Sequence, residues 1–303
     1  MTVSNSTVDS PARPATPLVS IIVATYNRGP FLERCVRSIL DQTYRAIECI
    51  VVDGASKDES VSILSRLAAT DPRLKFISEP DKGEVDAVNK GLDLATGEIV
   101  GFQASDDYYV PDAVAAALEF LLKNPRYLGV SGDAIYVDEK GKSLGRGVIT
   151  YRGRMTRGHI RKIIRLRYKM CPVCHGSFFG WRAQLLKHGK LNPDFSVTPD
   201  WEFYFRLMKA GEQIGSLPRI QYMYTAHTDM GAVKYWEKVE AQRRKLYEIH
   251  QVNRWDIFVR ATWGRMISYL ANPYRSPFVT GLWHELQLWL SQRRSRSGSQ
   301  PHS

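Results

Sequence analysis

The segment LVSIIVATYNR, residues 18–28, decides the fold class. It opens with a short apolar run rich in β-branched side chains, which is typical of a strand buried on both faces. Apolar side chains then recur at helical spacing over residues 28–42. A buried strand therefore leads into an amphipathic helix, the basic unit of an α/β domain.

The same alternation continues along the first half of the chain. Further buried strands are predicted at residues 47–52, 74–77 and 99–102. The predicted helices are one behind an S-x-x-E capping box formed by Ser56 and Glu59, one over residues 85–95, and one from Pro111 to Leu122. Short connections imply right-handed crossovers and a Rossmann-like, mostly parallel sheet, with ligands at the carboxyl ends of its strands.

The second half has a different pattern, with strands predicted at 177–180 and 220–224 and a helix at 201–210. From residue 234 onward the chain is helical in character and holds five of the seven Trp residues. We therefore predict a disordered tail at 1–16, a main α/β domain at 17–232, and a helical C-terminal extension with a disordered end at 233–303. Within the main domain we expect a nucleotide-binding half at about 17–110 and an acceptor half at about 111–232.

The composition excludes several classes of protein. The 303 residues are 44% hydrophobic, which is enough for a core and too much for a disordered chain. Four Cys are too few for a disulfide scaffold, so a reducing compartment is expected. Neither a secretory signal nor an uncharged apolar stretch of about 18 residues is visible, so we expect a cytoplasmic protein.

The basic charge is concentrated in one segment. Residues 141–190 hold 13 Lys and Arg and no Asp or Glu, whereas the whole chain carries a net charge of +11. Such a patch attracts polyanions, namely nucleic acid, anionic lipid or a pyrophosphate-bearing substrate, although most charge runs are simply solvated helix faces. Near the C-terminus, a Leu/Trp face over residues 282–290 is followed by Arg, which suits either a membrane interface or a helix that closes over the core.

Polar side chains gather where the predicted strands end. They are Thr25, Tyr26 and Asn27 after the first strand, Asp53 after the second, Ser105, Asp106 and Asp107 past the fourth, and Asp200 before the helix of the second half. Each alone has an ordinary explanation as a cap, a turn or a loop carboxylate. Those explanations do not account for the gathering of all of them at one edge of one sheet, where α/β proteins bind ligands.

Five stretches of the chain match one known family. They are SIIVATYNR, ECIVVDGASKD, SEPDKGEVDAVNKGLDLATGEIVGFQASDD, CHGSFFGWRAQLLKHGKLNPDF and PDWEFYFRLMKAG. On these stretches, which lie between residues 17 and 231, the chain resembles the family 2 glycosyltransferases with the type A fold. The resemblance implies an inverting enzyme that moves a sugar from a nucleotide-diphosphate donor, expected to be a UDP-sugar, to an acceptor hydroxyl in polysaccharide or glycolipid biosynthesis.

The resemblance also implies a metal cofactor, Mg²⁺ or Mn²⁺, that neutralises the leaving diphosphate. The Asp-x-Asp element of the family corresponds here to Ser105-Asp106-Asp107, with Ser in place of the first Asp. Asp107 is expected to contact the metal directly, and Asp106 to face the ribose or a metal-bound water. His227 lies where some relatives add a histidine near the diphosphate, so it is a second candidate metal ligand.

The donor's nucleoside is expected at the ends of the first two strands. Asp53 matches the carboxylate that hydrogen-bonds uracil in relatives, and the loop of Thr25, Tyr26 and Asn27 matches the one around the base and ribose. The DKGEVDAVNKG stretch is expected to open a helix beside the donor, where free N–H groups face an anion. Its candidate donor-binding residues are Lys82, Gly83, Asp86 and Asn89.

Inversion by a single displacement needs a base that removes the proton of the acceptor hydroxyl. Asp200, in Pro199-Asp200-Trp201-Glu202, matches the family's base, and Glu202 is the fallback. Because residues two apart on a helix point to different faces, the two carboxylates are not expected to serve the same hydroxyl.

The pattern CPVCH, residues 171–175, also spells a haem-attachment motif. Haem attachment needs an exported protein, and a zinc site needs two further ligands, so we interpret Cys171 and Cys174 as ordinary thiols flanking His175, which lines the acceptor site.

Three other functions stay open at this point. A nucleotidyltransferase would carry a Gly-rich loop after the first strand, where this chain has one Gly. A nucleic-acid-binding or anionic-surface-binding protein would use residues 141–190 but leaves the acidic residues without a role, so no nucleic-acid partner is expected. An inactive relative would bind a nucleotide sugar without turnover. For the transferase, the basic segment and the C-terminal end suggest contact with the inner membrane face, near a glycan or polyprenyl-linked acceptor.

Overall fold

The computed structural model describes residues 14–148, 171, 173–228 and 235–249. The chain divides into two compact units. The described part of the first unit runs up to residue 148 and from 171 to 226, and it holds the sheet. The second unit includes residues 227 and 228 and the helix α9 (Trp236–Ile249). The centre of the basic segment, the residues 282–290 and most of the predicted disordered ends lie outside the described residues.

The alternation predicted for the first half is confirmed. Its elements are β1 (Val19–Thr25), α1 (Gly29–Leu40), β2 (Ile47–Asp53), α2 (Ser60–Ala68), β3 (Leu74–Ser78), α3 (Glu84–Leu94) and β4 (Ile99–Ala104). The strands β3, β2, β1 and β4 pair side by side and all run parallel. Because β1 lies between β2 and β4, the strand order reverses at β1. In α/β proteins ligands bind outside the carboxyl ends of the strands at such a switch point.

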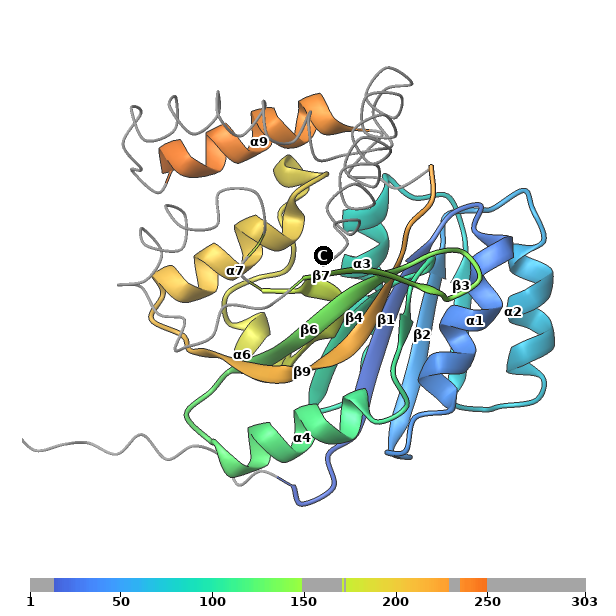
Figure 1. Cartoon of the computed structure of the whole chain (residues 1–303), viewed down its shortest axis with the longest axis horizontal. Coiled ribbons are helices and arrows are strands. Elements are labelled where there is room, and N and C mark those ends of the chain that lie inside the picture. Colours follow the sequence, from blue (N-terminus) through green and yellow to red (C-terminus); the bar gives the residue numbers. More distant parts are fainter. Residues whose placement is uncertain (1–13, 149–170, 172, 229–234, 250–303) are drawn as a thin grey trace, which may run out of the picture. The chain divides into compact units, whose positions relative to one another are not determined.

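The later elements extend this sheet with both parallel and antiparallel strand pairs. They are β5 (Tyr108–Tyr109), α4 (Ala113–Lys123), β6 (Gly129–Val137), β7 (Ser143–Val148), η1 (His175–Ser177), β8 (Phe178–Trp181), α6 (Arg182–Leu186), η2 (Pro193–Phe195), α7 (Pro199–Lys209) and β9 (Ile214–Thr225). In the described residues the order is β3-β2-β1-β4-β8-β6-β9-β5, with β7 beside β6 (Figure 1). The mostly parallel α/β fold is therefore as predicted, but β6 and β7 were not anticipated.

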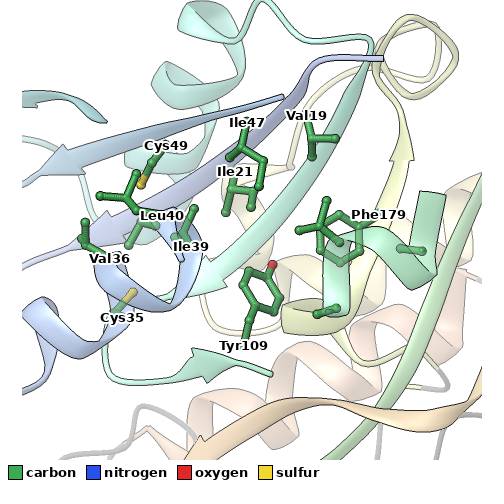
Figure 2. Close-up of a cluster of buried hydrophobic side chains, with 14 of the residues drawn as sticks. Val19, Ile21, Cys35, Val36, Ile39, Leu40, Ile47, Cys49, Tyr109 and Phe179 are labelled. Atoms are coloured by element: carbon green, nitrogen blue, oxygen red, sulfur yellow. The ribbon is translucent and has the colours of Figure 1, made fainter. Parts of the chain in front are cut away.

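Helices cover both faces of the sheet. Buried side chains of α1, α2 and α4 form one cluster with alternate residues of β1 and β2, such as Val19, Ile21 and Cys49 (Figure 2). On the opposite face, α3 packs so closely on β1 that a Cβ at Gly91 would lie 2.4 Å from a methyl group of Ile22. The burial of β1 on both faces explains why its sequence shows no polar alternation.

Two starts of helices differ from the sequence prediction. The helix α4 begins at Ala113 rather than at Pro111. The predicted capping box does not form, since α2 begins at Ser60 without a side-chain cap and Ser56 instead bonds to the ends of β1 and β2. A serine with a buried carboxylate in reach gains a stronger, charge-assisted hydrogen bond there than at a helix cap.

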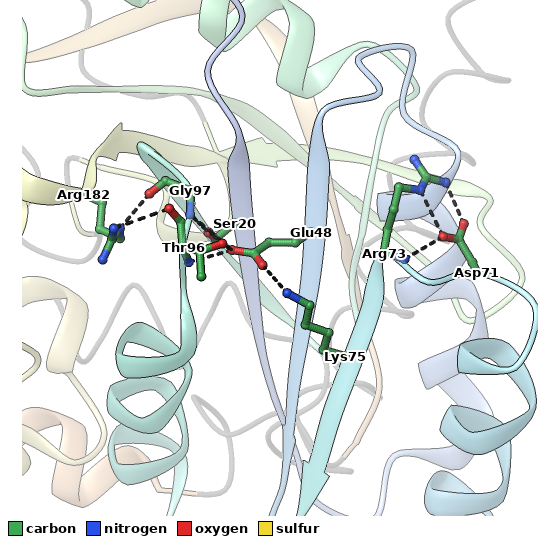
Figure 3. Close-up of polar contacts among 8 residues, drawn as sticks. All are labelled: Ser20, Glu48, Asp71, Arg73, Lys75, Thr96, Gly97 and Arg182. Carbon is green, nitrogen blue, oxygen red and sulfur yellow. Dashed lines mark hydrogen bonds and ion pairs between the residues drawn. The ribbon is translucent and has the colours of Figure 1, made fainter. Parts of the chain in front are cut away.

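A polar network crosses the edge of the sheet where β1 and β2 begin. The buried carboxylate of Glu48 accepts hydrogen bonds from Ser20 Oγ at 2.6 Å, from Thr96 N at 2.7 Å and from Lys75 Nζ at 2.9 Å (Figure 3). Burial alone would raise the pKa of Glu48, but these donors outweigh it and hold the pKa at about 2. The network ties β1, β2 and β3 to the loop before β4 at the edge opposite the predicted ligand site.

No helix in the described part of the chain is long and apolar enough to cross a membrane.

Candidate active site

The loops after β1 and β2 are tied together by side chains. Asn27, whose backbone has a positive φ of 50°, accepts a hydrogen bond from Lys57 N at 2.8 Å, and its own N–H donates to Ser56 Oγ at 2.8 Å. Asp53 is fully buried and accepts from Ser56 N at 3.0 Å, from Ser78 Oγ at 2.6 Å and from Ser56 Oγ. The end of β2 is thus held rigidly against its neighbours.

Thr25 and Tyr26 lie beside this loop in different surroundings. Thr25 is paired with Asp53 in the register of β1 and β2 and is 4% exposed. Its Oγ1 has no hydrogen-bond partner among the described residues, which is costly for a buried hydroxyl unless a ligand supplies one. Tyr26 is 57% exposed.

The Ser105-Asp106-Asp107 turn follows β4. Asp107 is buried, and its carboxyl accepts hydrogen bonds from Thr225 N at 2.7 Å and from the Tyr222 hydroxyl. Burial, and then the charge of Asp106, raise the pKa of Asp107 well above its ordinary value. Asp106 lies 3.7 Å from Arg28 Nε in an ion pair. The end of β4 therefore holds two adjacent carboxyls that a cation would stabilise.

In the stretch predicted to lie beside the donor, Gly83 directly precedes the first residue of α3, and its φ of 103° suits glycine. Lys82 N donates to the Asp86 carboxylate at 3.1 Å, and the Lys82 side chain is exposed. The Asn89 amide exchanges two hydrogen bonds with the backbone of Leu191, at 2.9 and 3.0 Å. Asp86 and Asn89 are thus engaged in holding the helix and the loop before η2, and their donor contact stays a prediction.

Asp200 is the second residue of α7 and is half-buried. Burial raises its pKa to about 6, although the carboxylate accepts hydrogen bonds from the backbone N–H of Trp201 and from the thiol of Cys171. Glu202 instead forms a two-pronged ion pair with Arg206, at 2.9 and 3.0 Å, so the carboxylate of the fallback base is already occupied.

Glu84, the first residue of α3, joins this site and was not singled out from the sequence. Glu84 as a whole is exposed to solvent, but nearby protein atoms partly desolvate its carboxyl group. This burial, and then the charges of Asp200 and Asp106, raise the pKa of Glu84 to about 7, against the opposing effect of Arg28. We call Glu84, Asp106 and Asp200 the carboxylate cluster. An acidic residue at a helix start was visible in the sequence, but its neighbours were not.

His175 is half-buried and packs against aromatic side chains. Its ring stacks on Phe102 with centroids 4.7 Å apart, and its Nδ1 lies 2.8 Å from the Tyr204 hydroxyl. Burial lowers the pKa of His175 to about 4, so the ring is neutral at ordinary pH. All four Cys are free thiols, and Cys35, Cys49 and Cys174 are buried.

The residues present fit a cation that is bound mainly by substrate. No group of three His, Cys, Asp or Glu side chains in the described part of the chain is placed to hold a metal ion. Mg²⁺ and Mn²⁺ bind readily to one or two carboxylates when substrate phosphates and water complete the shell, which suits Asp106 and Asp107. His227 belongs to the second compact unit, which is described by itself, so its role stays a prediction.

A protein-family model described as glycosyl transferase family 2 matches residues 20–189. The chain belongs to glycosyl transferase family 2. This glycosyltransferase is 28% identical over 246 residues to a chondroitin synthase of Escherichia coli, covering 80% of the chain and 33% of the relative. It is 32% identical to a PGL/p-HBAD biosynthesis glycosyltransferase of Mycobacterium bovis, over 63% of the chain and 70% of the relative. The chain thus spans about a third of the length of the chondroitin synthase.

Solved structures share the fold of this glycosyltransferase. S. aureus TarS 1-349 aligns with a TM-score of 0.61 at 21% identity, over 84% of this chain and 75% of that one. The mannosyltransferase PcManGT of Pyrobaculum calidifontis, solved with GDP-Man and Mn²⁺, aligns with a TM-score of 0.57 at 21% identity, over 93% and 82% of the two chains. The chain is therefore a type A glycosyltransferase that uses a nucleotide-sugar donor.

Proposed function

We propose that this enzyme transfers a sugar, with inversion and with the aid of Mg²⁺ or Mn²⁺, from a UDP-sugar to an acceptor hydroxyl in polysaccharide or glycolipid biosynthesis. The observation that carries the proposal is the carboxylate cluster. The charges of Asp106, from the predicted diphosphate site, and of Asp200, the predicted base, both raise the pKa of Glu84, which supports the assignment of the two residues to one site. In an inverting transfer, the leaving diphosphate and the attacking hydroxyl lie on opposite sides of the sugar. The cluster supplies Asp106 for the diphosphate side and Asp200 for the hydroxyl side.

The hydrogen bonds of Asp53 support uracil as the base of the donor. A carboxylate has about four acceptor positions, and Asp53 already uses three for Ser56 and Ser78. The remaining position suits the single ring N–H of uracil better than the adjacent ring and amino donors of guanine. The unpartnered hydroxyl of Thr25, in register with Asp53, offers a second contact to the nucleoside.

Asp106 and Asp107 would hold the cation together with the phosphate oxygens of the donor. When bound, this ion neutralises the negative charge that develops on the departing diphosphate. Thr225 and Tyr222 fix the orientation of the Asp107 carboxyl. Arg28, which pairs with Asp106, adds a positive charge on the same side of the site.

Asp200 would act as the general base. With a pKa of about 6 it is mainly ionised at neutral pH, and its pKa is close enough to neutrality for efficient proton transfer. The carboxylate takes the proton of the acceptor hydroxyl as the new glycosidic bond forms and the bond to the diphosphate breaks. The pKa of Glu84, raised to about 7 by burial and by the charges of Asp200 and Asp106, keeps this carboxyl protonated over part of the same pH range.

A donor panel followed by one substitution tests the proposal. Thermal shifts with UDP-sugars and GDP-sugars, each with and without Mn²⁺, identify the donor, because a ligand that binds the folded form raises the Tm. Transfer to candidate acceptors is then measured for the wild type and for Asp200→Asn. We expect stabilisation by a UDP-sugar with Mn²⁺, and loss of turnover in Asp200→Asn with donor affinity retained. Stabilisation by GDP-sugars alone contradicts the UDP assignment, and full turnover of Asp200→Asn contradicts the base.

We propose in addition that the acceptor is a glycan or a polyprenyl-linked glycan at the inner membrane face. The support is the basic excess of residues 141–190, because each basic residue near an anionic surface contributes about 1 kcal/mol. Sedimentation with anionic vesicles at low and high salt tests this contact. Salt-sensitive pelleting is expected, and its absence contradicts the membrane contact without affecting the transferase assignment.

A further inference from the structure

Arg34, on the helix α1, is a half-buried residue that the function proposed so far does not use. Its guanidinium donates two hydrogen bonds, from Nη1 to the backbone oxygen of Glu139 at 2.8 Å and from Nη2 to Thr225 Oγ1 at 2.9 Å. Its Cζ atom also lies 4.5 Å from the centre of the Tyr108 ring, which is a cation–π contact. One side chain of α1 therefore contacts three segments, namely β5, the turn between β6 and β7, and the end of β9.

Two of these contacts adjoin Asp107, the predicted metal ligand. Tyr108 follows Asp107 directly in the chain, and Thr225 N donates to Asp107 Oδ1 at 2.7 Å. Thr225 is 1% exposed and Asp107 is 4% exposed, so this hydrogen bond is shielded from water. Thr225 thus accepts a hydrogen bond from Arg34 through its side chain and donates one to Asp107 through its backbone. The end of β9 links the guanidinium to the carboxyl.

The turn between β6 and β7 that accepts the other hydrogen bond of Arg34 is closed by hydrogen bonds of its own. Asp138 Oδ1 accepts from two backbone N–H groups of the turn, at 3.0 and 2.8 Å. Gly141, with a φ of 84°, donates its N–H to the backbone oxygen of Asp138 at 2.8 Å. The helix that carries Arg34 is fixed as well, because one of its faces is buried in the core (Figure 2). Arg34 is therefore held at both ends and can hold Thr225 in turn.

We propose that Arg34 is a positioning residue for the metal site: its forked guanidinium ties the end of β9 to the turn after β6, so that Thr225 holds the Asp107 carboxyl in the orientation that binds the cation. The inference rests on the proposed function, since it takes Asp107 as a metal ligand. In this role Arg34 acts through Thr225 and Tyr108 and not on the donor itself. An arginine suits the role because its planar fork serves two acceptors on different segments, whereas a lysine is a single point donor on a flexible stem.

Hydrogen exchange in the full chain without any ligand gives the first readout. We expect Arg34→Lys, which keeps the charge and loses the fork, to speed the exchange of the Thr225 N–H about fivefold, the size that one modest hydrogen bond gives. Arg37→Lys is the matched control, because Arg37 lies on the same helix and pairs with Glu33 at the surface. This control should leave the exchange rate of the Thr225 N–H unchanged. An unchanged rate in Arg34→Lys overturns the inference.

Calorimetric titration of Mn²⁺ into the protein with UDP gives the second readout. Thr225→Val removes the hydroxyl that accepts from Arg34 but keeps the backbone N–H and every charge, so we expect the affinity for Mn²⁺ to fall about fivefold. Thr225→Ser retains a hydroxyl and should keep the affinity of the wild type. Arg34→Lys combined with Thr225→Val should lose no more affinity than either change alone, because both break the same contact. The binding of uridine, which lacks the diphosphate, should be unchanged in all these variants.

The outcomes separate this inference from the proposed function. Wild-type affinity for Mn²⁺ in Thr225→Val, or an additive loss in the double variant, overturns the role of Arg34 and leaves the transferase assignment intact. Loss of uridine binding together with Mn²⁺ binding shows a general loss of structure and also overturns the positioning role. If instead the wild type with UDP binds no Mn²⁺, the metal site of the proposed function fails, and the inference fails with it.

Discussion

The network around Glu48 gives a quantitative prediction for stability (Figure 3). The pKa of Glu48 falls from an ordinary value of 4.5 to about 2 in the folded protein, and the side chain is 5% exposed. At about 1.4 kcal/mol for each pH unit, this difference corresponds to about 3 kcal/mol of stability at neutral pH. The substitution Glu48→Gln should remove most of it, because the amide NH₂ cannot accept the hydrogen bond of Lys75 and the charge that strengthens the others is gone.

The pH dependence has a definite sign. A folded-state pKa that is lower than the unfolded one stabilises the protein above the unfolded value, so the contribution of Glu48 is complete above about pH 4.5 and is lost as the pH falls toward 2. The free energies of unfolding of the wild type and Glu48→Gln should therefore differ by about 3 kcal/mol at neutral pH and converge in acid.

Urea unfolding followed by circular dichroism at several pH values measures this difference. Lys75→Met is the control, because the ammonium group of Lys75 is largely in water, with a side chain 60% exposed, and should contribute no more than about 1 kcal/mol. Unfolding of Glu48→Gln at the same urea concentration as the wild type at neutral pH would refute this role of Glu48, as would a difference in stability that persists unchanged in acid.

Four further predictions concern the site. Turnover should rise with pH through about 6, the pKa of Asp200, as this carboxyl ionises. Glu84→Gln should leave this rise in place, because Glu84, with a pKa of about 7, is still protonated at that pH. A pH–rate profile of both proteins checks these expectations, and a rise in turnover well below pH 5 contradicts Asp200 as the base. Thr25→Val should weaken UDP binding by about fivefold to tenfold, measured by calorimetry, because the hydroxyl can no longer contact the nucleotide. The Tm of the free protein should change little, since this hydroxyl has no hydrogen-bond partner among the described residues. Equal UDP affinity of the variant and the wild type would show that the hydroxyl makes no contact with the nucleotide. Gly176→Ala should destabilise the fold by about 2 kcal/mol or more, because the new Cβ would lie 2.2 Å from the ring of Tyr222; an unchanged Tm rules this out. Chelation with EDTA should abolish turnover, and Mn²⁺ should restore it, whereas full activity in EDTA excludes the metal.

The sequence alone determined the elements of the first half and the sheet edge at which we predict the site. The run over residues 18–24 is apolar at every position except Ser20, which is typical of a strand covered on both faces. The helices between the strands show their buried stripe at helical spacing. Parallel strands carry their carboxyl ends to one edge. The order of Thr25, Asp53 and Asp106 along the chain was therefore enough to predict that they lie near one another.

Only the tertiary structure decided which side chains hold the loops and helices around the site in place. Ser56 satisfies a buried carboxylate instead of a helix cap, and Asn89 holds the backbone of Leu191, because distant segments offer partners that local patterns do not reveal. The carboxylate cluster also depends on the folded chain, since Glu84 on α3 and Asp200 on α7 are far apart in the sequence and the charge of Asp200 affects Glu84 only after folding. The local pattern of apolar residues predicts helices and strands, whereas hydrogen bonds and charge interactions depend on distances between residues that are far apart in the sequence.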